Sequence, residues 1–331
     1  NEKFPVVIFF HGLGSGGNGD SDLAEVLVHG PPKIVNNNLS DNVFVDNNMI
    51  MLAPQVTNNT WWNDGHIRPF LDYVINKYRI DEKRIYMTGF SAGSSGINDF
   101  LDDDPNAYQV TAATVVAVRG VVTLEGGGYL AELVPYWGLT AIGDASNTVI
   151  NSVNNMAGFL NNNTPTDVLD NYPGSQIDRT AHYASDGSGW VWQDGVVGIN
   201  HVNPKVTLYP GSSHATWEMT YNNNDVWSWL FAQVKPSVVI TSPNDNSTYI
   251  TSDLVSFLAD VQDLNGQMIS QYSWSSSIDG YLGAGKLATT LSEGNHLIEL
   301  IAIDFGKRGQ VVQIEIEVVE KIEDEIFKNS F

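Results

Sequence analysis

The apolar run at residues 6–10 is the feature that most restricts the fold of this chain. Five β-branched or aromatic side chains follow one another between Pro5 and His11, without the polar alternation of a strand that has one face in water. Strands of this kind belong to parallel sheets that are covered on both faces. Because parallel strands need long crossovers, the chain is predicted to alternate strands with helices.

The rest of the first 235 residues follows this pattern. Strands are predicted at residues 49–53, 84–88, 119–124, 137–142 and 205–209, and helices at about 66–79, 91–101, 149–161 and 224–234. Such alternation predicts an α/β fold with a doubly wound, mostly parallel sheet. Residues 1–235 are therefore assigned to one domain. The chain enters its first strand within five residues, so we expect a processed or trimmed N-terminus.

The sequence changes character at Pro236. Short runs in which polar and apolar residues alternate follow it, at residues 237–241, 254–259, 269–274, 296–304 and 311–319. Five or more short strands within about 85 residues predict an all-β sandwich of the immunoglobulin-like kind over 236–320. Residues 321–331 are charged and aperiodic, which predicts a linker or tail.

Composition excludes several classes of function. Asp and Glu number 38 against 16 Lys and Arg, and the formal net charge of −22 repels nucleic-acid phosphates and anionic membranes. The chain has no cysteine, which excludes a disulfide framework, a thiolate zinc site and a cysteine nucleophile. It also has no apolar run of about 18 residues, the length that a membrane span requires.

Residues 89–93, Gly-Phe-Ser-Ala-Gly, fit the pattern G-x-S-x-G between a predicted strand and a predicted helix. In that setting a serine nucleophile is held on a sharp turn. The flanking glycines let neighbouring backbone pass closely, and the free N–H groups of the helix face a developing negative charge. Ser91 is therefore the predicted nucleophile. The alternative is a serine in a glycine-rich turn that does no chemistry.

A second glycine-rich loop, His11-Gly12-Leu13-Gly14, follows the first strand. A loop in this place supplies a backbone N–H to the oxyanion hole of α/β-hydrolases, together with the residue after the nucleophile. The predicted pair of donors is the amides of Leu13 and Ala92.

A serine hydroxyl also needs a general base. Of the seven histidines, His214 lies just past the strand at 205–209 and follows Ser91 in the chain. Loops at the carboxyl ends of strands are where catalytic side chains gather in such sheets. His214 is therefore the predicted base.

Aromatic residues in polar loops are candidates for contact with a substrate. Trp61, Trp62, Trp190 and Trp192 lie in segments rich in Gly, Asn and Asp. They are expected either to line an acyl or aryl cleft or to form the rim of the core. For His11, a structural role at the end of its strand competes with a contact to substrate.

Four polar side chains of the second domain are suited to Ca²⁺, which prefers oxygen ligands. They are Asp260, Asp263, Asn265 and Asp304. Their spacing fits no EF-hand, so solvated turn residues are the favoured interpretation, and no metal site is predicted.

Several segments together resemble a known family. PVVIFFHGLG, MLAPQ, IDEKRIYMTGFSAG and YPGSSHATW occur in this order within residues 4–234. They resemble secreted α/β-hydrolase esterases often labelled "predicted peptidase", which are similar to polyhydroxybutyrate depolymerases and feruloyl esterases. The resemblance implies an α/β-hydrolase fold and serine-dependent ester hydrolysis with no cofactor. Residues 237–319 resemble bacterial immunoglobulin-like modules of secreted proteins.

The resemblance also bears on the acid that orients the base. In that family the acid stands three residues after a glycine, and the matching position here, counted from Gly143, holds Ser146. Asp144 is the nearest carboxylate, and we expect it to orient His214. Three alternatives stay open: Glu125, which follows the preceding predicted strand, an acid from the irregular stretch 165–200, and the loss of the acid altogether.

These features predict a secreted, extracellular serine esterase that acts on small or polymer-borne esters. A depolymerase of polyesters or polyhydroxyalkanoates is the alternative within the same chemistry. A non-catalytic relative that binds polysaccharide is the alternative from another class. In either case the second domain is expected to serve as a spacer or as a contact to a surface or polysaccharide.

Overall fold

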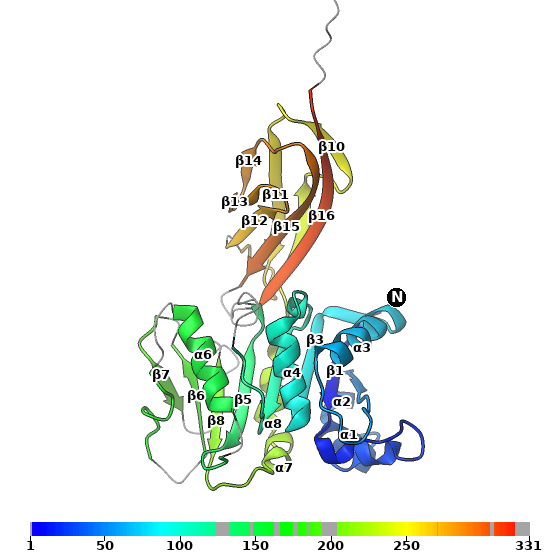
Figure 1. Ribbon diagram of the computed structural model, residues 1–331, viewed down its shortest axis with the longest axis vertical. Helices are drawn as coiled ribbons and strands as arrows, with labels where there is room; N and C mark the ends of the chain where they lie inside the picture. The colour runs from blue at the N-terminus through cyan, green and yellow to red at the C-terminus, as the bar shows by residue number, and fades with distance from the viewer. Residues whose placement is uncertain are drawn as a thin grey trace, which may run out of the picture. The chain divides into compact units, whose positions relative to one another are not determined.

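A computed structural model describes residues 2–123, 133–145, 148–161, 166–174, 178–184, 186–193, 204–269, 271–304 and 308–321. The chain divides into two compact units, Asn1–Lys235 with Phe305–Arg308 and Pro236–Asp304 with Gly309–Phe331 (Figure 1). None of the helices in these ranges combines the length and the apolar character needed to cross a membrane.

The first unit is built on an eight-stranded sheet in the order β2-β1-β3-β4-β5-β8-β6-β7. Its strands are β1 (Phe4–Phe10), β2 (Ile50–Leu52), β3 (Ile80–Phe90), β4 (Ala112–Val116), β5 (Tyr136–Ala141), β6 (Arg179–Tyr183), β7 (Trp190–Gln193) and β8 (Lys205–Tyr209). Each neighbouring pair in the series β2, β1, β3, β4, β5 and β8 is parallel. The strands β6 and β7 add an antiparallel edge beside β8. The sheet is thus the mostly parallel α/β sheet that the sequence predicts.

Helices cover both faces of this sheet. They are α1 (Gly30–Asn37), α2 (Val43–Asp46), α3 (Asp64–Lys77), α4 (Ala92–Asp103), α6 (Val149–Asn161), α7 (Trp217–Tyr221) and α8 (Asn224–Ala232). Short 3₁₀ segments lie at η1 (Leu13–Ser15), η2 (Leu23–Leu27) and η3 (Ala107–Gln109). Figure 1 shows α4 and α6 lying across one face of the sheet.

Burial on both faces explains the uninterrupted apolar run of β1. Val7 and Phe9 belong to the same apolar cluster as Trp227 and Leu230 of α8. Ile8 points the opposite way, because successive side chains of a strand alternate between faces. It is also fully buried, on the face where α4 packs against β1, β3 and β4.

The order of the strands reverses at β1. The chain passes from β1 to β2 on one side and then crosses to β3 on the other. In open α/β sheets the loops at the carboxyl ends of the strands diverge at such a point and leave a crevice where ligands bind. The loop after β1 and the turn after β3 both border this crevice.

In the sheet of the first unit, one predicted strand is displaced and one hairpin is additional. Residues 119–123 form no strand, so the predicted strand at 119–124 is wrong over its described part, and the strand in this region is β4 at Ala112–Val116. The hairpin of β6 and β7 was not predicted, because its partly exposed β7 has no clear apolar period.

The second unit contains two sheets that share one apolar core. Its strands are β9 (Ser237–Ser242), β10 (Ser247–Ile250), β11 (Val255–Gln262), β12 (Tyr272–Ser276), β13 (Gly280–Ala284), β14 (Leu287–Thr289), β15 (Gly294–Ile303) and β16 (Gly309–Val319). They are ordered β10-β16-β15-β12-β13 and β14-β11-β9. Phe257 and Trp274, from different sheets, are both fully buried in the shared core. The two sheets agree with a sandwich, and its immunoglobulin-like class stays a prediction.

Candidate active site

Ser91 occupies a strained turn between β3 and α4. Its backbone dihedrals are φ 52° and ψ −118°, a region that residues with a side chain rarely adopt. The backbone N–H of Ser91 donates to the carbonyl oxygen of Val116 at 2.9 Å, which ties the turn to the end of β4. The serine therefore stands at the carboxyl edge of the sheet, directly before the first turn of a twelve-residue helix.

The glycines on either side of this turn are required by close contacts with β1. A Cβ on Gly89 would lie 2.7 Å from the carbonyl oxygen of Phe10. A Cβ on Gly93 would overlap the same oxygen. The G-x-S-x-G pattern therefore reflects the packing of the turn onto the end of the neighbouring strand.

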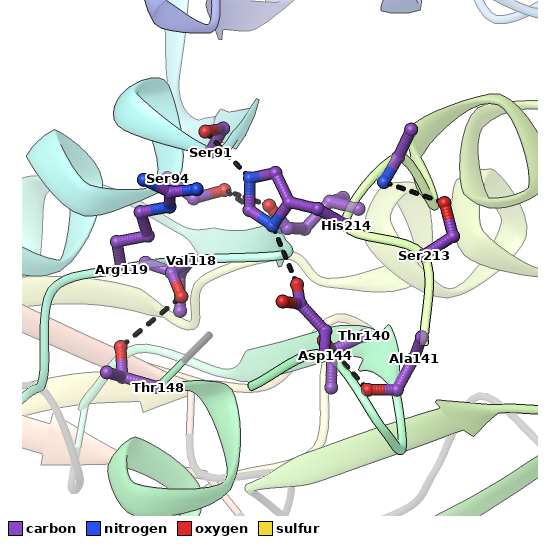
Figure 2. A network of polar contacts seen from close by, with 12 residues as sticks. Ser91, Ser94, Val118, Arg119, Thr140, Ala141, Asp144, Thr148, Ser213 and His214 are labelled. Atoms are coloured by element: carbon purple, nitrogen blue, oxygen red, sulfur yellow. Dashed lines mark hydrogen bonds and ion pairs between the residues drawn. The ribbon is translucent and has the colours of Figure 1, made fainter. Parts of the chain in front are cut away.

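His214 reaches Ser91 from the loop between β8 and α7. Its Nε2 lies 3.0 Å from the Oγ of Ser91, although the residues are 123 positions apart. The imidazole is a quarter exposed. Figure 2 shows the ring between the serine on one side and Asp144 on the other.

Asp144 completes this chain of hydrogen bonds. Its Oδ2 lies 2.6 Å from Nδ1 of His214, and its side chain is only 4 % exposed. A carboxylate accepts only, so Nδ1 carries the proton and Nε2 is free to accept the proton of the serine hydroxyl. The turn that holds Asp144 is fastened to the loop after β8, where the Gly143 N–H donates to the Gly211 carbonyl at 2.9 Å.

The two amides predicted as oxyanion donors flank the serine. Leu13 begins η1 directly after β1, and Ala92 is the first residue of α4. In the described part of the chain, neither N–H donates to a backbone or side-chain acceptor. The first N–H groups of a helix lack intrahelical partners, so both amides are available to a bound oxygen.

A pocket of about 270 Å³ opens beside Ser91. Its lining residues are Gly12, Leu13, Gly14, Ser15, Glu25, Val28, His29, Phe90, Ser91 and Trp217. The rings of Phe90 and Trp217 stack with centroids 4.5 Å apart and form an apolar wall. Trp217 also meets the His214 ring edge to face at 5.9 Å, so this wall adjoins the predicted base.

For His11 and Trp62, the burial of both side chains favours the structural alternative over contact with substrate. Both side chains are buried, with exposures of 1 % and 5 %. The Nδ1–H of His11 donates to the Gly12 carbonyl at 2.7 Å, and its Nε2 accepts from the Val56 N–H at 3.2 Å. Burial lowers the pKa of His11, against a smaller opposing effect of the bond to Gly12, so the ring is neutral and fixes the loop after β1.

The other predicted tryptophans also lie outside the pocket beside Ser91. Trp190 and Trp192 are on β7, at the far edge of the sheet, where they pack on Tyr183 and Tyr172. Trp61 is 44 % exposed and is not among the lining residues. The tryptophan that does line the pocket is Trp217, and its place three residues after His214 was the signal that could have identified it.

Glu125, an alternative for the acid, lies outside the described residues, as does Ser146, which occupies the position where the resemblance implies the acid. In the second unit, Asp263 is engaged locally, because its Oδ1 accepts from the N–H groups of Asn265 and Gln267 at 2.8 Å. Among the residues that the structure describes, no three His, Asp or Glu side chains are grouped so as to hold a metal ion.

No protein-family model matches the sequence, and no curated protein matches it either. Among solved structures, a thermostable esterase is 19 % identical with a TM-score of 0.47, over 71 % of this chain and 56 % of its own. The chain therefore spans little more than half of that esterase. Fibronectin(III)-like modules of Clostridium thermocellum CbhA are 22 % identical with a TM-score of 0.23, over 25 % of this chain and 98 % of theirs. Both TM-scores are below 0.5, so neither likeness identifies the chemistry of the site.

Proposed function

We propose that this protein is a serine hydrolase that cleaves carboxylic esters through an acyl-enzyme. The observation that carries the proposal is the unbroken series of contacts from Ser91 through His214 to Asp144, with heavy-atom distances of 3.0 and 2.6 Å. A nucleophile, a base and an acid in this order form the geometry by which serine hydrolases are recognised on unrelated folds.

In the first half of the proposed reaction, the Oγ of Ser91 attacks the ester carbonyl while Nε2 of His214 takes the hydroxyl proton. The carbonyl oxygen gains a negative charge, which the amides of Leu13 and Ala92 stabilise. His214 then gives the proton to the departing alkoxide, and the alcohol leaves. Asp144 stabilises the imidazolium and keeps the ring oriented.

In the second half, water attacks the acyl-enzyme by the same route. Nε2 of His214 takes a proton from the water as its oxygen adds to the acyl carbon. Collapse of the second tetrahedral intermediate breaks the bond to Ser91, and the proton on His214 returns to the serine oxygen. The carboxylic acid leaves, and the enzyme is restored.

Carboxylic esters are favoured over amides by the sequence segments that resemble secreted esterases, and polyesters are the alternative substrate. The same resemblance supports a location outside the cell. The proposal extends to the second unit, whose surface has a hollow of about 520 Å³. Amide, hydroxyl and carboxylate side chains line it, as suits contact with a polysaccharide: Asn246, Thr248, Ser277, Asn295, Glu315 and Glu317.

The test is hydrolysis of p-nitrophenyl acetate together with covalent labelling by a fluorophosphonate. The wild-type protein should do both, and Ser91→Ala should do neither while its circular dichroism spectrum is unchanged. A folded wild-type protein that neither hydrolyses the ester nor takes the label would contradict the proposal. It would favour the non-catalytic alternative.

A further inference from the structure

His29 lines the pocket beside Ser91 but takes no part in the proposed reaction. It precedes α1, and its ring meets the rings of Phe90 and Trp217 edge to face, each at a centroid distance of 5.7 Å. The imidazole is about one-third exposed. A polar ring is therefore held at the apolar wall of the pocket, where it can meet a bound molecule.

Glu218 fixes the orientation of this ring. Its Oε1 lies 2.9 Å from Nδ1 of His29, and its Oε2 accepts from the Nζ of Lys33 at 2.9 Å. Burial alone would raise the pKa of Glu218, but the hydrogen bonds from His29 and Lys33 and the charge of Lys33 outweigh it and lower that pKa. Glu218 is therefore a carboxylate, which accepts hydrogen bonds and donates none.

The carboxylate determines which nitrogen of neutral His29 carries the proton. Since Glu218 accepts at Nδ1, Nδ1 is the protonated nitrogen and Nε2 presents a lone pair. No hydrogen bond within the described residues occupies Nε2. Glu25 also lines the pocket and adds acceptor oxygens. The pocket thus combines an apolar wall with hydrogen-bond acceptors, which suit a hydroxyl group and repel a carboxylate.

We infer that His29 is a specificity residue that accepts a hydrogen bond from a hydroxyl group of the ester substrate, with Glu218 as its positioning residue. The inference rests on the proposed ester hydrolysis and names the substrate class: neutral esters that carry a hydroxyl group on the part bound in this pocket. The acyl or alcohol carbons of such esters pack against Phe90 and Trp217.

The experiment compares kcat/KM for matched pairs of esters in which a hydroxyl replaces a methyl group. Ethyl 6-hydroxyhexanoate against ethyl heptanoate tests the acyl side, and 2-hydroxyethyl butyrate against propyl butyrate tests the alcohol side. The wild-type protein should prefer the hydroxylated ester of at least one pair. His29→Phe keeps a ring against the wall but has no acceptor, and it should lower that preference by about 3–10-fold, the size of one neutral hydrogen bond.

Two further variants separate recognition from a structural effect. Glu218→Gln offers an amide that can donate to Nδ1, so it permits the other tautomer and should reduce the preference. Lys33→Gln removes a contact to Glu218 but leaves the bond between Glu218 and His29, so it should retain the preference. In Lys33→Gln, kcat/KM for the methyl-ended esters should change little, and in His29→Phe and Glu218→Gln the loss should be larger for the hydroxylated ester than for its methyl-ended partner.

The inference is overturned if the wild-type protein hydrolyses these esters without a preference in either pair, or if His29→Phe leaves the preference unchanged. It is also overturned if monoethyl adipate, a carboxylate of matched length, is preferred over ethyl 6-hydroxyhexanoate. Binding of the two ester pairs to Ser91→Ala can be measured by calorimetry, which needs no turnover. Tighter binding of the hydroxylated ester by that variant, without hydrolysis by the wild-type protein, would contradict the proposed function and support the recognition by His29.

Discussion

The carboxylate of Asp144 lies 2.6 Å from the imidazole of His214, although the two residues are 70 positions apart. They meet because β5 and β8 are parallel neighbours, so the turn after β5 and the loop after β8 leave the same edge of the sheet. The bond from the Gly143 N–H to the Gly211 carbonyl joins these two segments directly. The position of Asp144 is therefore fixed by the backbone at this edge of the sheet.

Asp144→Asn should reduce kcat by about 10⁴-fold while KM changes little. An amide can donate to Nδ1 of His214, which leaves the proton on Nε2 and prevents that nitrogen from accepting the serine proton. Steady-state kinetics on p-nitrophenyl acetate measures the effect, and Asp41→Asn at an exposed position serves as the control. A small loss in Asp144→Asn would show that another group, or none, acts as the acid.

Ser91→Gly should be more stable than Ser91→Ala, although both lack the nucleophile. At φ 52° and ψ −118° a side chain costs about 1–3 kcal/mol, which glycine avoids. The greater freedom of glycine in the unfolded chain offsets part of this gain, so we expect a net difference of about 1 kcal/mol. Thermal unfolding should show it as a melting temperature a few degrees higher for Ser91→Gly. Equal melting temperatures would mean that the turn is not strained.

Gly93→Ala should destabilise the fold despite the better helix propensity of alanine. A Cβ at this position overlaps the carbonyl oxygen of Phe10, so α4 and β1 have to separate. Overpacking of this kind costs about 1–3 kcal/mol. The control is Gly120→Ala, where the nearest atoms would be 3.5 Å away in Ser95. Chemical denaturation compares the two, and similar midpoints would refute the packing argument.

Lys205→Met should make the protein more stable at pH 7, and the gain should shrink as the pH rises toward 10. The Lys205 side chain is fully buried, with Nζ 3.7 Å from the centroid of the Trp137 ring and no hydrogen-bond partner among the described residues. Burial lowers its pKa to about 7, and the charge of Asp225 opposes this only in part.

The sign follows from the protons bound in each state. Between pH 7 and about 10.5 the unfolded chain keeps the Lys205 proton longer than the folded chain, so wild-type stability rises with pH in this window. At about 1.4 kcal/mol for each unit between the two pKa values, the rise in wild-type stability across this window is at most about 5 kcal/mol. Unfolding free energies of both proteins measured across this range test it. A gain that is the same at every pH would show that Lys205 does not titrate there.

Much of the sheet could be predicted because buried parallel strands have a distinctive composition. The runs that became β1, β2, β5 and β8 are rich in β-branched, aromatic or other apolar residues and end in glycine, proline or polar turns. β4 was missed because the apolar character of its region continues past Val116 to Val122, and composition alone does not show where the strand ends. The end of β4 is set by how the strand pairs with its neighbours, and that pairing depends on the whole fold.

The candidate site was likewise predictable only in part. Ser91 and His214 could be predicted because local patterns and the rule for strand ends identify them. The pairing of His29 with Glu218 could not, because these residues are 189 positions apart and neither belongs to a motif. For the tryptophans, the sequence left a cleft lining and a rim of the core as alternatives, because the choice between them depends on tertiary packing.

The contact of Gly89 and Gly93 with the end of β1 has a consequence for the folding of the first unit. The turn around Ser91 packs directly on the carbonyl oxygen of Phe10, and β1 pairs with β3 across a long stretch of chain. Such distant pairings form slowly, because the intervening loop has to close first. If Ser91 reacts as proposed, its labelling therefore reports when β1 has paired with β3. During refolding, fluorophosphonate labelling should rise later than helical circular dichroism.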